Sequence, residues 1–267
     1  MIPILTICRK EFEDRLRNGW ILALALAFAL FAFVIGVAGF GFTGKVGGVD
    51  SEATILSLTS LVLYLIPLLG LLLGYDGIAG EQEQGTLDLL RAYPIQPTDL
   101  VLGKWAGLGA VLLVILVAGL ATPSILAVVN GHPLLPWFAF TGLSAWLGLV
   151  FVGLALWFST LATQRGTVLG LALALWLVLV ILFDVGVIGL LVATGGDLPA
   201  TLVNGLFYLN PTSLFRFLNL LYLLDVDAMA EMGFAGHAAA PWRQMVALAI
   251  WGMVPVGLGI HQLRRMN

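Results

Sequence analysis

Between Gly77 and Trp105 the sequence reads GIAGEQEQGTLDLLRAYPIQPTDLVLGKW, and six of these side chains are charged, although only 10% of the whole chain is. No pair of carboxylates, Ser–His pair or HExxH motif forms a recognisable catalytic set in this stretch or elsewhere. A short, punctuated polar segment between long apolar runs is instead typical of a contact surface. We therefore expect it to dock a soluble partner, and we expect no enzymatic site in this chain.

A short helix is expected within this segment. Thr86 can cap it, since a threonine hydroxyl accepts hydrogen bonds from the first amides of a helix. Leu87, Leu90 and Tyr93 then share one helical face, and Pro94 ends the helix. The alternative is a solvated hairpin loop, which would carry fewer apolar residues. The residues expected to contact the partner are Glu81, Glu83, Gly85, Thr86, Leu87, Leu90 and Pro94. Thr98 and Asp99 are expected to cap and open the next long helix.

Two other stretches imitate binding sites. Residues 39–46 read GFGFTGKV, which has the glycine and lysine spacing of a phosphate-binding loop. That motif needs Ser or Thr after the lysine, and Val46 stands there, so we reject an ATP site. Met229, Met232 and His237 could offer soft ligands to Cu(I), but such a loop is more often without a metal. We therefore predict no metal site and no cofactor in this chain.

Asp184 is the acid most deeply set in an apolar run. A charged aspartate at the centre of a membrane helix costs roughly 2.5–3.5 kcal/mol on insertion scales, so such a residue is usually partnered or functional. Two interpretations remain open. Either Asp184 lies within the bilayer as a pathway or structural residue, or the helix ends early and leaves it at the interface.

The composition predicts a membrane protein. Of 267 residues, 60% are hydrophobic, and a spanning helix needs about 20 apolar residues. The net charge of −3, with no basic cluster, argues against nucleic-acid binding. We expect an all-α integral membrane protein with one domain over residues 1–267. Its six expected spans lie at about 20–42, 54–75, 100–129, 136–161, 167–193 and 243–262.

The charges also predict an orientation. With the N-terminus inside, nine Lys and Arg residues fall on the cytoplasmic side and three outside, as the positive-inside rule requires. Both termini are then cytoplasmic. The first apolar run is longer than the core of a signal peptide, so we interpret it as a retained span. The single cysteine, Cys8, excludes an intramolecular disulfide.

Two further helices are expected outside the spans. Residues 4–17 place Leu5, Cys8, Phe12 and Leu16 on one face, which predicts an amphipathic helix on the inner membrane surface. A frayed polar tail is the alternative. In the long outer segment between spans 5 and 6, Asn210 and Pro211 read as an N-cap followed by proline at the first helical position.

The stretch EQEQGTLDLLRAYPIQPTDLVLGKW resembles the E-x-E-x-G-T-L-x-L-L…P signature of ABC-2-type permeases. The six spans and the outer motif of Asn210, Pro211, Phe215 and Arg216 extend that resemblance over the whole chain. LNPTSLFRFLNLLYL in particular resembles the branch of the family that serves the maturation of the copper centres of nitrous oxide reductase.

The resemblance implies a bacterial inner-membrane homodimer that works with cytoplasmic ATPase subunits, which bind the ATP and magnesium. The charged segment is then the coupling helix, and the outer motif is a platform for a periplasmic copper-handling partner. An ABC-2 exporter of another substrate is the alternative. A secondary transporter or an intramembrane enzyme would need polar groups at mid-membrane or a catalytic set, and the sequence offers little of either.

Overall fold

The structure is a computed structural model that describes residues 2–41, 51–87, 95–195, 205–223 and 241–265. Within these ranges the chain is helical and contains no strand. The elements are α1 (Ile2–Leu16), α2 (Gly19–Gly41), α3 (Ser51–Gly74), α4 (Ala79–Glu83), α6 (Pro97–Val129), α7 (Leu135–Ser159), α8 (Arg165–Trp176), the π-helix η1 (Leu177–Leu182), α9 (Phe183–Ala193), α11 (Pro211–Leu223) and α14 (Pro241–Arg265).

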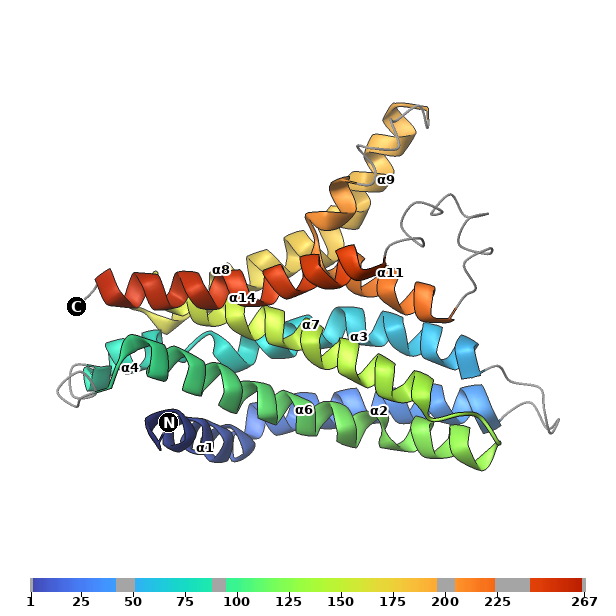
Figure 1. Cartoon of the computed structure of the whole chain (residues 1–267), viewed down its shortest axis with the longest axis horizontal. Helices are drawn as coiled ribbons and strands as arrows, with labels where there is room; N and C mark the ends of the chain where they lie inside the picture. Colours follow the sequence, from blue (N-terminus) through green and yellow to red (C-terminus); the bar gives the residue numbers. More distant parts are fainter. Residues whose placement is uncertain (1, 42–50, 88–94, 196–204, 224–240, 266–267) are drawn as a thin grey trace.

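Six helical stretches among the described residues are long and apolar enough to cross a membrane, as the sequence predicted. They are α2, α3 with α4, α6, α7, the continuous rod of α8, η1 and α9, and α14. Figure 1 shows α2, α3, α6, α7, α8 and α14 side by side and α9 pointing away from them, with α1, α4 and the last turns of α14 at one end of the bundle. We call this the terminal end, and the opposite end the far end.

The centre of the bundle is the contact between α3 and α7, where glycines bring the two backbones together. A Cβ on Gly70 would lie 2.8 Å from the carbonyl oxygen of Gly148, and one on Gly74 would lie 2.8 Å from Cβ of Ala155. Small residues are a common means of association in membranes, because lipid tails supply no hydrophobic drive between helices. This glycine pair therefore sets the spacing of the core.

A second glycine pair seats α1 against α6. Cβ atoms on Gly103 and Gly107 would lie 2.9 Å from Cβ of Ile7 and 2.6 Å from the carbonyl oxygen of Cys8. The face of α1 that meets the bundle thus runs through Ile7 and Glu11, and Leu5 is exposed. Glu11 on this face pairs with a buried lysine of α6. The expected placement of Leu5, Cys8, Phe12 and Leu16 on the inner membrane surface stays a prediction.

Tryptophan side chains connect the helices by hydrogen bonds. Four indole N–H groups donate to backbone carbonyls of another segment at 3.0–3.1 Å, in an interior that offers few other polar groups. The pairs are Trp105 with Leu149, Trp146 with Leu248, Trp176 with Tyr64, and Trp251 with Tyr208. They fix the rotation of α6, α7, α8 and α14 about their axes.

The tight approach of α1 to α6 predicts the effect of a single methyl group. Gly107→Ala would place Cβ against the Cys8 carbonyl oxygen, so we expect α1 to shift and the free energy of unfolding in detergent to fall by about 1–3 kcal/mol. Gly142→Ala is the matched control, because nothing lies within 4 Å of its Cβ position. Equal stability of the two variants would show that α1 is not seated on Gly107.

Candidate functional site

The terminal end holds a row of alternating charges that reaches into the bundle. Nζ of Lys104, on α6, donates to Glu11 of α1 at 2.5 Å and to Glu81 of α4 at 2.8 Å. The side chain of Lys104 is only 2% exposed. Lys10 lies 4.0 Å from the same Glu81 oxygen, at the solvent edge of the row.

The row continues through α1 to the end of α3. The guanidinium of Arg15 donates two hydrogen bonds to the carboxylate of Asp76, at 2.5 and 3.1 Å, and its Nε lies 3.9 Å from Glu11. Burial lowers the pKa of Arg15, but the hydrogen bonds and charge of Asp76 outweigh burial and hold that pKa above its ordinary value. Three acids and three bases therefore alternate. We call Lys10, Glu11, Arg15, Asp76, Glu81 and Lys104 the terminal network.

The terminal network joins three parts of the chain that are far apart in sequence. Because Lys104 has two acidic partners, removing either carboxylate leaves the other to hold it, whereas removing the lysine leaves two buried acids together. The network borders a polar cavity of about 260 Å³. One oxygen in this region, Oε2 of Glu81, is buried without a hydrogen-bond partner. Charge pairs thus tie α4 to α1 and α6.

The residues expected to contact an ATPase lie on and after α4, and the structure separates them. Glu81 points into the terminal network, and Leu87 is 2% exposed within an apolar cluster that includes Val101 and Leu263. Both are occupied inside the chain and are therefore not free to meet a partner in this conformation. Leu90 and Pro94 lie outside the described residues.

The other predicted coupling residues remain accessible. Oε2 of Glu83 accepts a hydrogen bond from the Arg165 amide at 2.9 Å, and its side chain is 50% exposed. Gly85 has φ of 70°, a left-handed conformation that ends α4 and favours glycine. The Thr86 hydroxyl donates back to the Glu81 carbonyl at 3.2 Å. A role of these residues in ATPase contact stays a prediction.

The start of α6 corrects the expected cap. The N-cap is Gln96, followed by Pro97 at the first helical position, and the Gln96 amide donates to Asp99 at 3.4 Å. Asp99 lies in the first turn as expected, but Thr98 is inside the helix. Proline needs no hydrogen bond at this position, so the helix begins two residues earlier than expected.

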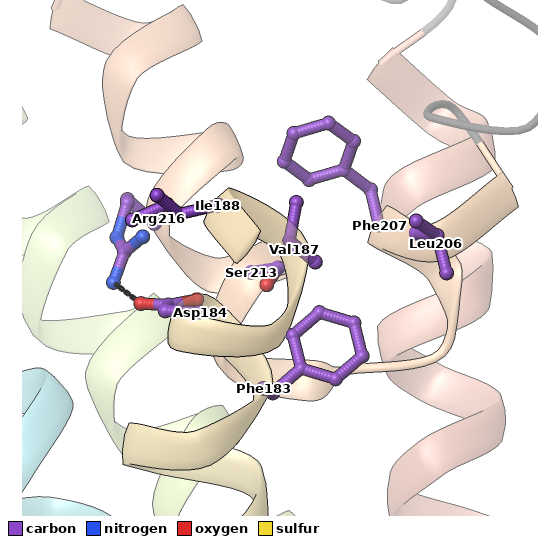
Figure 2. A pocket seen from close by; sticks show the side chains of 8 residues that line it. All are labelled: Phe183, Asp184, Val187, Ile188, Leu206, Phe207, Ser213 and Arg216. Atoms are coloured by element: carbon purple, nitrogen blue, oxygen red, sulfur yellow. Dashed lines mark hydrogen bonds and ion pairs between the residues drawn. The ribbon is translucent and has the colours of Figure 1, made fainter. Parts of the chain in front are cut away.

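Asp184 has a partner. Arg216 of α11 donates to its carboxylate at 2.7 Å, and Figure 2 shows the pair at one side of a cavity of about 180 Å³. Most of the lining is apolar, with Phe183, Phe207 and Ile188 around it. The helix continues past Asp184 to Ala193, so the helix itself does not end before this acid. Whether Asp184 lies within the bilayer or at its interface stays a prediction.

The outer motif is turned inward. The α11 helix begins at Pro211 with Asn210 as its cap, as the sequence predicted. Oδ1 of Asn210 accepts a hydrogen bond from the Thr212 amide at 3.0 Å. Asn210 and Phe215 are each 0% exposed, and Pro211 is also buried. The expectation that these three side chains form an accessible platform was wrong, because an apolar helix of this kind packs into the bundle. Arg216 is only partly exposed.

The weak metal candidates, Met229, Met232 and His237, lie outside the described residues. Within the described ranges, no group of three His, Cys, Asp or Glu side chains could hold a metal ion.

Sequence reasoning did not anticipate the terminal network. Glu11 and Arg15 lie in the helix expected over residues 4–17, and Asp76 directly follows the second expected span, but none of the three was given a partner. Lys104 lies inside an apolar span, and a lysine buried there needs a carboxylate partner. That need is the signal that could have predicted its pairing with Glu11.

Comparison with known proteins identifies the chain's relatives. Residues 5–267 match the family described as ABC-2 family transporter protein. The chain belongs to the ABC-2 transporter family. It is 40% identical over 280 residues to the probable ABC transporter permease protein NosY of Pseudomonas aeruginosa, covering 99% of each chain. It is also 40% identical over 226 residues to the protein of the same name from Stutzerimonas stutzeri, covering 82% of each.

Membership of the ABC-2 family places this chain among multi-pass membrane permeases. An ABC permease is one subunit of a complex whose ATP is hydrolysed by a separate ATPase. The exposed residues after α3, among them Glu83 and Gly85, lie at the same end of the bundle as the terminal network. They are the candidates for contact with the ATPase.

The burial of Lys104 predicts a large effect of one substitution. Lys104→Met removes the buried cation that bonds directly to both Glu11 and Glu81, so we expect the free energy of unfolding to fall by about 3–5 kcal/mol. Lys10→Met is the matched control at the exposed edge of the same network, with an expected loss below about 1 kcal/mol.

A second substitution separates lost charge pairing from lost packing. Lys104→Met/Glu11→Gln should recover part of the loss, since one uncompensated carboxylate has been removed. Equal destabilisation by Lys104→Met and Lys10→Met, measured by unfolding in mixed micelles, would contradict the network's role.

Proposed function

We propose that this chain is the permease subunit of an ABC complex that matures the copper centres of nitrous oxide reductase. Two copies would assemble with cytoplasmic ATPase subunits, which bind ATP and magnesium, and with a periplasmic copper-handling protein. The observation that carries the proposal is 40% identity over 99% of both chains to a NosY permease. The outer stretch LNPTSLFRFLNLLYL supports it.

The proposed location is the bacterial inner membrane, with both termini cytoplasmic. Basic residues support this orientation, since Lys10, Arg15, Lys104 and Arg165 all lie at the terminal end. The exposed part of the segment after α3 then faces the cytoplasmic ATPase.

We propose that ATP-driven movement enters at Glu83 and its neighbours and spreads through the terminal network. Glu81 is bonded to Lys104 in α6, and Asp76 at the end of α3 is bonded to Arg15 of α1. Breaking such pairs inside a protein is costly, so a push on α4 would move α1, α3 and α6 together rather than bend one loop.

The distribution of possible copper ligands favours mechanical transmission over passage of copper through the bundle. A Cu(I) route would need thioether, thiol or imidazole groups at successive depths. Met245 and Met253 of α14 are 56% and 54% exposed on the outside of the chain. Asp184 is already paired with Arg216. Movement would therefore pass to the outer segment around residues 198–242, where the periplasmic partner would bind.

An ABC-2 exporter permease for another substrate is the second candidate. The family match supports it as well, and the small cavity beside Asp184 is the feature that such a substrate could use.

Glu83→Lys tests the coupling and the copper role together. We expect the variant to reach the membrane at a normal level, because Glu83 is half exposed, but to associate less with the ATPase. Nitrous oxide reductase made in the same cells should contain less copper, and cells lacking this chain should show the largest loss. Association is measured by co-purification and copper by elemental analysis of the reductase.

Glu52→Lys is the control for Glu83→Lys. It makes the same charge reversal on an exposed acid at the opposite end of α3, and it should leave both readouts unchanged. Full copper content in cells without this chain would disprove the copper role. Normal ATPase association of Glu83→Lys would disprove the coupling contact alone.

The complete complex in proteoliposomes decides between transmission and transport. With copper or small sulfur compounds offered on either side, we expect ATP hydrolysis without accumulation of either solute across the bilayer. ATP-dependent accumulation that Asp184→Asn abolishes would instead make Asp184 a pathway residue.

A further inference from the structure

The π-helix η1 leaves one backbone carbonyl without its usual partner. The amide of Phe183 donates to the carbonyl of Val178, five residues earlier. In an α-helix that amide would bond to Leu179, four residues earlier. The Leu179 oxygen has therefore lost its helical donor at a depth where a spanning helix meets no water, and an unsatisfied carbonyl there costs several kcal/mol.

The first turn of α11 supplies the missing donor. Nδ2 of Asn210 donates to the Leu179 oxygen at 2.7 Å. The hydroxyl of Thr212 lies 3.3 Å from the same oxygen and 2.8 Å from Oδ1 of Asn210, so it shares its one proton between them. Asn210 thus caps α11 with its oxygen and holds η1 with its nitrogen. Because both ends of the Asn210 side chain are bonded, the start of α11 is held in one position against η1.

The two sides of η1 are held very differently. Just before it, Trp176 donates to the Tyr64 carbonyl and ties α8 to α3. After it, α9 contains no buried residue, and Figure 1 shows α9 diverging from the bundle. The Asp184–Arg216 pair joins α9 to α11, and a cavity lies beside this pair (Figure 2). The outer half of this span is therefore attached mainly through η1 and α11.

We propose that η1 is a two-register hinge and that Asn210 holds it in the π register. If Asn210 releases the Leu179 oxygen, the Phe183 amide can return to it and η1 becomes α-helical. A shift of one residue turns the helix that follows by about 100° and moves it by about 1.5 Å. Asp184 then turns away from Arg216, so both contacts of α11 with this span open together. π-segments within helices often mark functional sites.

The proposal concerns this chain alone and does not depend on copper or on the ATPase. It predicts that any movement of α11 changes the rotation of α9. Because the cavity lies between these elements, the rotation has space in which to occur.

Nitroxide scanning of α9 tests the hinge. A cysteine is placed in turn at each position from 185 to 192 of the full chain, in a Cys8→Ser background in lipid nanodiscs, and the accessibility of the label to oxygen is measured. The wild-type sequence should give one periodic pattern. In Asn210→Ser, which keeps a capping oxygen for α11 but loses the amide donor, we expect the pattern to move by one position.

Asn219→Ser is the matched control. Asn219 is also a buried amide of α11, but it donates to Phe215 of its own helix, so the pattern should stay in place. If Asn210→Ser does not fold, Thr212→Val replaces it in the test. This variant loses only the weaker hydroxyl contact with the Leu179 oxygen, so we expect the accessibility pattern to shift partly, in the same direction. An unmoved pattern in every folded variant, or an equal shift in Asn219→Ser, would overturn the proposal.

Discussion

The absence of water in the hydrocarbon core governs how this chain places its polar groups, because every donor and acceptor there must find a partner within the protein. Hydroxyls solve the problem locally, and those of Thr59, Ser124 and Thr141 each donate to the carbonyl four residues earlier. Tryptophans solve it between helices by donating to carbonyls of neighbours. The polar contacts are few, so each one determines the relative position of two elements.

The charged groups follow the same constraint with larger energies. At the terminal end, Lys104 is buried between two carboxylates, which makes the short helix α1 part of the bundle. In the other half, Arg216 holds Asp184, which ties α11 to the fifth span. Each ion pair joins a short helix outside the spans to a long helix within them, so both short helices can pass force to the bundle.

The bundle also differs in rigidity along its length. The α3–α7 contact is close because glycines remove the side chains between them, and its core is densely buried. By contrast, α9 has no buried residue and follows a π-helix. The proposed transmission of movement would need both properties, a stiff part that carries displacement and a looser part that responds to it. The contacts place the stiff part around α1, α3, α6 and α7, and the looser part at α9.

The sequence alone determined the features that depend on local composition. Length and hydropathy predicted six spanning helices, and Asn210 followed by Pro211 predicted the start of α11, because spans and caps are set by neighbouring residues. The family was evident from the motif around Glu81 and Gly85. What only the tertiary structure decided is which groups meet: Glu11 with Lys104, Asp184 with Arg216, and Asn210 with the Leu179 carbonyl. These partners are separated by more than 30 positions in the chain, and helix rotation within the bundle, which no local pattern specifies, brings them together. The same reason explains why Asn210 and Phe215 were expected on an outer surface and lie inside.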